Sequence, residues 1–461
     1  MSTPAKRFVR AAAAVLVVLW ASLGSGDANI PSRVRRPVRI SSMRVPRQLH
    51  AQQAMVRPRR RGYATDRVLV RFRPGVDETY ADGLLRSYGF PAVRRISGIG
   101  VYSVRTAPGA TIVETLALLR RNPDIALARP DYRIRLAEIP NDPYFLNYQY
   151  ALRNNGGVLD IDPENRPQMT AGADIKATAA WDVAKGDAET IIAIVDTGVD
   201  MTHPDLVGKL VSTGHDFAND DEDATDDVWH GTHVAGIAAA NTNNGVGIAG
   251  VAWNCRILPV KVTDANGDGF YSWIIDGIIW AADNGAKVIN LSLGGDVDDP
   301  FLKEACQYAH DKGVVIVASA GNDGLLGVLF PAAYDDYVLA AAASDYNDDI
   351  ADFSNFGPEI DVAAPGVLIL GPVPQFYADA TFGSGSLPYV FATGTSASAP
   401  HVSGMAALIR SAKPDLSVDD LMKVIRYTAD DVNKAEFPGR DDHAGYGRIN
   451  MARALVPTIL R

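Results

Sequence analysis

Cysteine is scarce in this chain, with two residues among 461, and only 8% of the residues are aromatic. So few cysteines exclude a small fold held together by several disulfides. Hydrophobic residues make up 47% of the sequence, which excludes a wholly disordered chain, and the length allows two or three domains of about 150 residues each. Cys255 and Cys306 are compatible either with one disulfide or with two buried thiols, and their spacing does not decide between these.

Only one long apolar run is present, and it lies near the N-terminus. Basic residues precede it, the run extends from Ala11 to Leu23, and small residues follow. This order is typical of a secretory signal, so residues 1–26 are predicted to direct a secreted, extracellular protein. A membrane anchor is the alternative, but the run is shorter than the roughly 20 residues that span a bilayer. Once the signal is removed, we expect no membrane association.

Acidic residues are almost absent from the first part of the chain. Residues 1–136 carry 25 Lys and Arg against 8 acids (+17), whereas residues 137–461 carry 19 against 46 (−27). Ten arginines and no acid lie between Pro31 and Arg61, so residues 27–65 are predicted to form a basic, disordered linker. A nucleic-acid-binding arm is the alternative interpretation. No aromatic residue interleaves these arginines and the acidic part would repel a polyanion, so we expect no nucleic-acid partner.

Residues 66–136 show the periodicity of a small α+β domain. Alternation of apolar and polar residues predicts strands, and helical spacing predicts helices between them. The predicted strands are 67–72, 99–104 and 125–128, and the predicted helices are 76–88 and 111–121. This order suggests a β-α-β-β-α-β domain of ferredoxin type.

Beyond Asn141 the pattern becomes that of an α/β domain, predicted over residues 141–461. Buried-type apolar strands alternate with helical stretches, which predicts a doubly wound, mostly parallel sheet with helices on both faces. The predicted strands are 190–195, 257–262, 286–291 and 314–318, and the predicted helices are 232–240, 272–283, 300–312 and 400–410. In such sheets the active crevice lies at the carboxyl ends of the strands.

Four polar residues occur at predicted strand ends or helix starts. Asp196 ends the segment I-I-A-I-V-D and Asn322 ends V-A-S-A-G-N. His230 opens H-G-T-H-V-A-G, and Ser396 lies in G-T-S-A-S-A-P. An aspartate after an apolar strand can simply cap a turn, so Asp196 alone carries little weight. Because the ends of parallel strands meet at one edge, these side chains are expected to converge.

Together, these residue types supply what nucleophilic acyl transfer requires. A serine hydroxyl needs a neutral imidazole to accept its proton, and a buried carboxylate orients that imidazole. The oxyanion then needs donors, for which the Asn322 amide and the Ser396 backbone N–H are available. Ser396 rather than Ser398 is the predicted nucleophile, because the Gly394-Thr395 turn presents its hydroxyl. Pro400 falls at the start of the helix that follows, where a missing N–H costs little.

The order Asp, His, Ser, with the motifs D-T-G, H-G-T-H-V-A-G, A-G-N and G-T-S-x-S-x-P, resembles the subtilisin-like serine proteases, most closely their calcium-dependent, thermitase-like branch. The likeness covers residues 141–455 and includes S-L-G-G at 292–295, D-V-A-A-P-G at 361–366 and G-Y-G-R-I-N at 445–450. It implies a secreted serine endopeptidase made as a zymogen, with protein substrates and a monomeric state.

The resemblance also implies how an extended peptide would bind. It assigns substrate binding to two loop segments, Gly267, Asp268 and Gly269 on one side and Ser292, Leu293 and Gly294 on the other. Main-chain pairing of this kind suits an enzyme that accepts many sequences. Leu329 falls where the family often has a small residue at the floor of the specificity pocket, so we expect a shallow pocket that prefers medium apolar side chains over Phe or Tyr.

Calcium is the cofactor that the sequence favours. Seven acids between Asp216 and Asp227 would repel one another unless they were solvated or neutralised by a hard cation. The resemblance implies two sites, the first with Asp142, Asp205 and Asn244 and the second with Asp216 and Asp221. A solvated acidic segment without metal is the alternative for each.

Three other patterns suggest different ligands and are rejected. Gly245, Gly247 and Gly250 spell a dinucleotide fingerprint, but they follow a helix and precede a strand, the reverse of the required order. D-A-N-G-D-G at 264–269 matches the start of an EF-hand loop, whose twelfth position would be isoleucine instead of glutamate. His230 and His233 have no third metal ligand at suitable spacing, so a catalytic and a packed histidine are expected; His203 and His401 are also expected to be structural.

The sequence departs from the family pattern at three places. Trp229 stands where the family commonly has glycine, and Ala397 stands where methionine is usual. Residues 371–391 look like an insertion that leads directly into the serine motif. These changes are expected to reshape the cleft without removing the catalytic groups.

The basic domain at 66–136 resembles the inhibitory propeptide of the family. Its tail, residues 128–133, is expected to pass through the cleft, with opposite charges steering the two parts together and self-cleavage near residues 136–141. A narrow processing protease with one target is a rival hypothesis. A catalytically inactive, peptide-binding homologue is another, and the intact catalytic residues argue against it.

Overall fold

The structure is a computed structural model that describes residues 63–91, 93–132, 138–161, 166–212 and 214–456. It also describes three short strands, β1 (Ala14–Val15), β2 (Val17–Leu19) and β3 (Val38–Arg39). The predicted signal and linker therefore lie largely outside the described residues. The chain divides into two compact units, residues 48–136 and residues 1–47 with 137–461. None of the described helices is long and apolar enough to cross a membrane.

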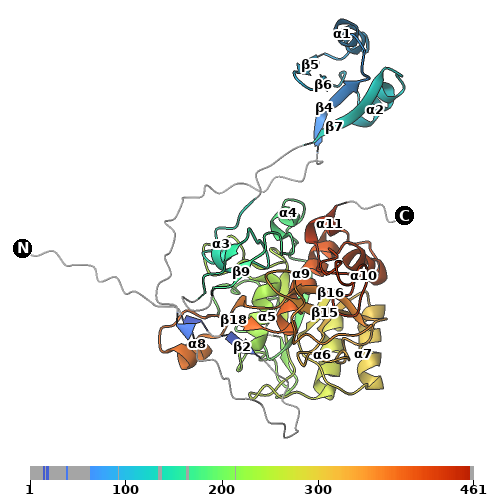
Figure 1. The fold of residues 1–461 in the computed structure, drawn as a ribbon. Helices are drawn as coiled ribbons and strands as arrows, with labels where there is room; N and C mark the ends of the chain where they lie inside the picture. The colour runs from blue at the N-terminus through green and yellow to red at the C-terminus, as the bar shows by residue number, and fades with distance from the viewer. Residues whose placement is uncertain are drawn as a thin grey trace, which may run out of the picture. The chain divides into compact units, whose positions relative to one another are not determined.

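The smaller unit is an antiparallel four-stranded sheet with two helices, drawn in blue and teal in Figure 1. Its elements are β4 (Tyr63–Phe72), α1 (Glu78–Ser87), β5 (Val93–Ile96), β6 (Val101–Arg105), α2 (Ile112–Arg120) and β7 (Ile125–Tyr132). The strand order β5-β6-β4-β7 and this element order are those of a ferredoxin-like domain, as predicted. Asp77 caps α1, and Thr111 with Glu114 forms a capping box at α2.

Two expectations for this unit need correction. Strand β5 was not among the predicted ranges, because its sequence V-R-R-I places two arginines in the middle of a four-residue strand. The tail that was expected to pass through the cleft is, as far as Tyr132, part of β7, where Ala128 pairs with Val70 and Arg129 with Leu69. Pro130 is tolerated there because β7 is an edge strand of the sheet.

The larger unit is built on a seven-stranded sheet in which every pairing is parallel. The strands are β10 (Ile191–Asp196), β11 (His215–Asp216), β12 (Arg256–Lys261), β13 (Val288–Leu291), β14 (Val315–Ser319), β15 (Val338–Ser344) and β16 (Ile360–Pro365). Their order is β11-β12-β10-β13-β14-β15-β16. Strand β10 therefore lies between β12 and β13, and Asp196 is in register with Lys261.

Helices cover both faces of this sheet, which confirms the doubly wound prediction. The principal helices are α5 (His230–Ala239), α6 (Tyr271–Asp283), α7 (Pro300–Asp311) and α9 (Thr395–Ala412). Buried residues of α5 and α9 pack with Ile192 and Ile194 on one face, whereas those of α6 and α7 pack with Ala193 and Val195 on the other. Figure 1 shows α6 and α7 side by side.

Smaller elements complete the larger unit. They are α3 (Phe145–Tyr148), β8 (Gly157–Val158), β9 (Gln168–Met169), α4 (Ala177–Trp181), β17 (Ile369–Pro372), α8 (Gln375–Phe382), β18 (Tyr389–Thr393), α10 (Val418–Tyr427) and α11 (Met451–Leu455). Strands β17 and β18 pair antiparallel around α8, and β2 pairs parallel with β18.

The two cysteines lie in separate parts of the core. Cys255 packs with the residues under α5 and α9, and Cys306 belongs to α7 on the opposite face. Both are free thiols, so the structure decides the alternative that the sequence left open. Burial raises the pKa of each thiol to about 12, which makes both unreactive at neutral pH.

Candidate active site

The sheet brings the predicted residues to one edge. Asp196 is the last residue of β10, and Asn322 lies in the loop after β14. His230 is the first residue of α5, and Ser396 lies in the first turn of α9. All four are therefore at the carboxyl ends of strands or at helix starts, as the strand-end argument predicted.

Close packing at the start of α5 sets the position of His230. A methyl group added to Gly231 would lie 2.0 Å from the carbonyl oxygen of Gly198, so α5 begins in direct contact with the loop that follows β10. His230 Nδ1 and Asp196 Oδ1 are 2.7 Å apart. Asp196 Oδ1 also accepts a hydrogen bond from the Thr197 backbone N–H at 2.8 Å, which fixes the carboxylate.

The environment of His230 changes the affinity of its ring for a proton. Burial lowers the pKa of His230, but the charge and hydrogen bond of Asp196 and the charge of Asp226 act in the opposite direction. The net result is a pKa above the ordinary value of 6.5. A carboxylate that stabilises the imidazolium in this way suits a general base.

Asp226 is a buried carboxylate that joins the two segments carrying Asp196 and His230. Its Oδ1 accepts hydrogen bonds from Thr197 Oγ1 at 2.9 Å and from the Trp229 backbone N–H at 2.8 Å. Its Oδ2 accepts from Thr232, from the backbone N–H at 2.9 Å and from Oγ1 at 2.5 Å. Because α5 has no side-chain cap at its own N-cap residue, Asp226 satisfies one of its orphan donors.

The helix that carries Ser396 begins earlier than the sequence suggested. The predicted start was Pro400, but α9 begins at Thr395, so Pro400 lies in the second turn. Since proline has no N–H to donate to the carbonyl four residues earlier, the carbonyl oxygen of Ser396 has no such helical partner. Ser292 Oγ donates to it instead, at 2.8 Å. Asn290 in turn donates to Ser292 Oγ at 2.9 Å, which ties α9 to β13.

Asn322 is held with its amide group oriented. Its Oδ1 accepts hydrogen bonds from Thr395, from the backbone N–H at 2.8 Å and from Oγ1 at 3.0 Å, so the Asn322 N–H groups point elsewhere. A methyl group added at Gly394 would lie 3.1 Å from Ser396 Oγ and 3.5 Å from Asn322 Nδ2. Glycine thus keeps space open between the predicted nucleophile and the predicted oxyanion donor. Ser398 Oγ is fully buried and donates to Ala364 O at 2.9 Å.

A cavity of about 110 Å³ opens between the predicted substrate-binding segments. It is lined by the following residues: Asp196, Thr197, His230, Val262, Thr263, Gly267, Gly269, Ile274, Ser292, Leu293 and Gly294. The two segments follow β12 and β13, the neighbours of β10 in the sheet, and this is why they flank Asp196. Asp268 is exposed and is absent from the lining, because alternate residues of this loop face the cavity.

Leu329, the predicted floor of the specificity pocket, is not among the residues that line this cavity, but it lies beside Gly294 and Gly321. A methyl group at Gly294 would lie 3.0 Å from Leu329 Cβ, and one at Gly321 would lie 2.9 Å from Leu329 Cγ. The Leu329 side chain therefore fills space between a substrate-binding segment and the loop that carries Asn322. Its backbone N–H donates to Ala320 O at 3.0 Å, which fixes the chain there.

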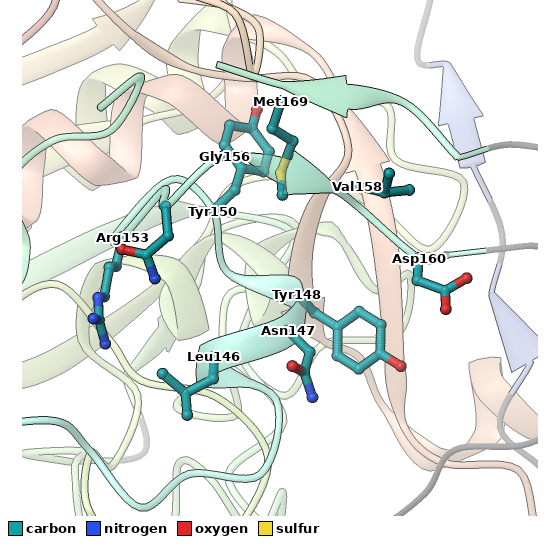
Figure 2. Close-up of a pocket in the computed structure, with 10 residues that line it drawn as sticks. Leu146, Asn147, Tyr148, Tyr150, Arg153, Gly156, Val158, Asp160 and Met169 are labelled. Carbon is teal, nitrogen blue, oxygen red and sulfur yellow. The ribbon is translucent and has the colours of Figure 1, made fainter. Parts of the chain in front are cut away.

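A larger cavity, of about 500 Å³, lies at α3 and the β8–β9 hairpin. Figure 2 shows Arg153 and Asp160 on opposite sides of it, with Tyr148 between them. Among the described residues that line it there is no serine, cysteine or histidine, so its walls offer no activated nucleophile. The smaller cavity beside His230 is accordingly the candidate active site.

The residues of the first predicted calcium site lie together. Asp142 is 4% exposed and Asp205 is fully buried, and the Asn244 side chain donates to Asp205 at 3.0 Å. Burial raises the pKa of Asp142 to about 7 and that of Asp205 to about 6. A methyl group at Gly247 would lie 2.1 Å from Asp205 Oδ2, so glycine leaves a cradle beside the carboxylate. Buried oxygen donors of this kind fit a hard divalent cation.

The second predicted calcium site is less concentrated. Asp216 and Asp221 form a two-way backbone bridge, but Asp216 accepts three hydrogen bonds from Ala218 and Asn219, and Asp221 is exposed. Within the described part of the chain, no group of three or more His, Cys, Asp or Glu side chains could hold a metal ion, and this applies to both predicted sites. Both calcium sites therefore stay predictions. The first is supported by its two buried carboxylates, and the second has no further support.

The three histidines that were expected to be structural, His203, His233 and His401, have backbone contacts. His233 Nε2 lies 3.2 Å from Ile369 O, and burial lowers its pKa to about 3. His203 Nε2 lies 3.1 Å from Pro388 O, and His401 Nδ1 lies 2.8 Å from Ala397 O. Each therefore has a backbone contact instead of a place in the cavity.

Sequence reasoning missed several residues that support the site. Asp226 was counted only as one of seven acids, and no local signal marked it as the carboxylate that binds Thr197 and Thr232. Tyr389 donates to Asp205 Oδ2 at 2.9 Å, although the two residues are 184 positions apart in the sequence. Neither segment contains a local pattern that predicts this contact. Thr395 could have been noticed, since it stands inside the G-T-S motif.

Comparison with known proteins decides the family. The model of the subtilase family matches residues 187–447, more than half of the chain. The chain belongs to the subtilase family. A model of the fervidolysin N-terminal prodomain matches residues 49–131 of this subtilase.

Similar proteins cover most of the subtilase. It is 40% identical over 398 residues to the thermophilic serine proteinase of Bacillus sp. (strain AK1), covering 86% of this chain and 88% of that protein. It is 41% identical to thermitase of Thermoactinomyces vulgaris, covering 68% of this chain and 99% of thermitase.

Among solved structures, fervidolysin from Fervidobacterium pennivorans, described as a keratinolytic enzyme related to subtilisin, matches with a TM-score of 0.55 and 30% identity. The match covers 87% of this chain and 62% of fervidolysin. This subtilase is therefore a thermitase-like serine endopeptidase with a propeptide, as the motifs predicted.

Proposed function

We propose that this subtilase is a secreted endopeptidase, made as a zymogen, that hydrolyses peptide bonds in proteins through Asp196, His230 and Ser396. In this mechanism His230 accepts the proton of Ser396 Oγ as the hydroxyl attacks the scissile carbonyl carbon. Asp196 orients the imidazole and stabilises its cation. His230 then gives the proton to the leaving amine, and water repeats the sequence on the acyl-enzyme. The 2.7 Å contact between His230 and Asp196 is the observation that carries the proposal.

The oxyanion of the tetrahedral intermediate would be bound by the Asn322 amide and the Ser396 backbone N–H. Thr395 supports this role, because it occupies Asn322 Oδ1 and leaves the N–H groups available. Ser396 lies in the first turn of an 18-residue helix, where the positive end of the helix dipole favours an anion.

An extended substrate would lie between Gly267–Gly269 and Ser292–Gly294. The flanking positions of these segments in the cavity support main-chain pairing on both sides. Leu329 would limit the depth of the specificity pocket, so that medium apolar side chains are preferred over Phe or Tyr.

The precursor is proposed to have four parts: a signal over residues 1–26, a basic linker over 27–65, the propeptide over 66–136 and the catalytic domain over 141–461. Opposite net charges would draw the propeptide onto the catalytic domain, and cleavage near residues 136–141 would release it. Calcium would be held at Asp142, Asp205 and Asn244, where it would neutralise two buried carboxylates and stabilise the fold.

Labelling with a serine-reactive phosphonate tests the triad. The wild-type protein should be labelled at Ser396, and Ser396→Ala should be neither labelled nor active. Labelling of Ser396→Ala, or its trimming near residues 136–141 at the wild-type rate, would contradict the proposal.

Digestion of unfolded casein separates a broad endopeptidase from the rival narrow processing protease. Absence of labelling in the wild-type protein would favour the catalytically inactive homologue.

A further inference from the structure

The backbone immediately before His230 is in an unusual conformation. Trp229 has φ 153° and ψ −24°. Glycine adopts positive φ angles readily, whereas a residue with a bulky side chain rarely does. The Trp229 side chain is also 7% exposed, so it is buried as well as strained. Such conformations persist only where surrounding contacts enforce them. These contacts matter for catalysis because they act one residue away from His230.

Trp229 is held by a backbone hydrogen bond and by contacts of its ring. Its backbone N–H donates to Asp226 Oδ1 at 2.8 Å. Its ring stacks on that of Tyr377, with the centroids 5.3 Å apart and the planes 26° from parallel. The same indole meets the His230 ring edge-on, at 5.7 Å and 79°. The stack on Tyr377 is therefore continuous with the imidazole of the proposed general base.

Tyr377 belongs to residues 371–391, the segment that the sequence marked as an insertion and that we call the aromatic arm. It includes α8, which Figure 1 labels beside β18. The Gln375 side chain donates to Asp379 Oδ1 and to Ser386 O, both at 2.9 Å, which ties the helix to the loop before β18. Val373 and Ala378 are buried against Trp229 in the same apolar cluster. These contacts fix the position of α8, and therefore of Tyr377, relative to Trp229.

We propose that Tyr377 is a positioning residue for His230. By stacking on Trp229 it keeps a strained backbone in place and so holds the imidazole in line between Asp196 and the serine. The aromatic arm and Trp229 form a matched pair: a large residue is tolerated before His230 because the arm supplies a surface for it. This inference rests on the proposed function, since it assigns a role toward the proposed general base.

A contact that only stabilises the fold would behave differently from a positioning contact. Loss of the Tyr377 ring should free Trp229 to relax and displace His230. The charged or titratable groups facing His230 are Asp196 at the end of β10, Asp226 before α5 and His233 on α5. Asp196 and Asp226 raise the pKa of His230, so displacement should weaken their effect and move the acidic limb of kcat/KM to lower pH. Simple destabilisation would reduce the amount of folded enzyme and leave that limb unchanged.

A double-mutant cycle on the full chain tests this. Tyr377→Ala, Trp229→Gly and the combined variant are compared by kcat and KM on a peptide anilide, with active sites counted by the serine phosphonate. Tyr377→Phe keeps the ring, Tyr377→Leu fills the arm without an aromatic face, and Phe376→Ala is the matched control, since Phe376 is the neighbouring residue on α8 and is 52% exposed.

Tyr377→Ala should lower kcat between tenfold and hundredfold, the range for a displaced catalytic group, with KM changed less than about twofold. Tyr377→Phe should recover most of that loss, and Phe376→Ala should match the wild type. The decisive result is in the cycle. Because glycine adopts the backbone of residue 229 without strain, Trp229→Gly should make the enzyme nearly indifferent to Tyr377→Ala.

Additive losses in the cycle, or an acidic limb that does not move in Tyr377→Ala, would overturn the inference. If Tyr377→Ala gives no titratable sites, Tyr377→Leu is judged by the same criteria. If neither Tyr377→Ala nor Trp229→Gly releases its propeptide, release by the combined variant supports the inference. Failure of the combined variant to release its propeptide overturns the inference. A wild-type protein that the phosphonate does not label would instead sink the proposed function, before the cycle begins.

Discussion

Removal of calcium from the proposed site at Asp142 and Asp205 should make the stability of this subtilase depend on pH, because these two carboxylates are buried. Burial raises the pKa of Asp142 from 3.8 to about 7 and that of Asp205 from 3.8 to about 6. At about 1.4 kcal/mol per pKa unit, keeping both groups ionised without a cation costs about 4 kcal/mol for Asp142 and about 3 kcal/mol for Asp205.

The sign follows from proton binding. Because the folded state binds these two protons more tightly than the unfolded chain does, the metal-free protein loses stability as pH rises from about 4 to about 7. A bound cation removes that loss by neutralising the carboxylates. A calcium concentration 100 times the dissociation constant contributes about 2.7 kcal/mol, so the expected gap between metal-bound and metal-free protein at pH 8 is about 3 kcal/mol or more. At pH 5 we expect the gap to be below about 1 kcal/mol.

Urea unfolding of Ser396→Ala, which avoids self-digestion, measures this with calcium or with chelator at pH 5 and pH 8. Asp142→Asn should reduce both the pH dependence in chelator and the benefit of calcium. Asp160→Asn, at an exposed acid of the same unit, is the matched control and should change neither. Parallel stability curves in calcium and chelator across this pH range would refute the assignment of a cation to Asp142 and Asp205.

Four further outcomes are expected, the first two with magnitudes taken from other serine proteases that have the same catalytic arrangement. Asp196→Asn should lower kcat about 10⁴-fold with an unchanged circular dichroism spectrum, because the imidazole loses its tautomer control. Asn322→Ala should lower kcat about 10²–10³-fold with little change in KM. Since the pKa of His230 is above 6.5, kcat/KM should rise with pH through a value above 6.5, and a limb at or below 6.5 would contradict this. In a peptide library, cleavage after Leu or Ala should exceed cleavage after Phe, and Leu329→Ala should narrow that difference; equal wild-type cleavage would refute the shallow pocket.

The sequence was most informative where a chemical requirement coincides with a local pattern. A buried run that stops at Asp196, or a small-residue helix that starts at His230, can be recognised within ten residues, and the parallel sheet then explains why such ends meet. The predicted start of α9 was wrong, because it was placed at Pro400 and the helix begins at Thr395. Pro400 suggested a helix start, but a proline in the second turn is tolerated here because Ser292 takes the carbonyl that the missing N–H would have bound.

Contacts between distant segments were not accessible to sequence reasoning. Tyr389 reaches Asp205, and Tyr377 stacks on Trp229, through the antiparallel pair β17–β18, whose position over α5 depends on the whole tertiary fold. Periodicity describes which face of an element is buried and does not identify the partner on the other side. Residues 371–391 were predicted to be an insertion, but their contacts with Trp229 could be identified only from the coordinates.

The presence of the catalytic motifs in a sequence is therefore a weaker criterion for an active subtilase than the presence of the residues whose hydrogen bonds position those motifs. Asp196 and His230 belong to segments that Asp226 joins through Thr197 and Thr232, so a chain could keep both motifs and still lose their relative placement if Asp226 changed. The hydrogen bond from Ser292 to the Ser396 carbonyl supports the position of the proposed nucleophile in the same way. A catalytically inactive homologue should be sought first among chains that alter these supporting residues, because a substitution there would displace the catalytic groups while leaving every diagnostic letter in place.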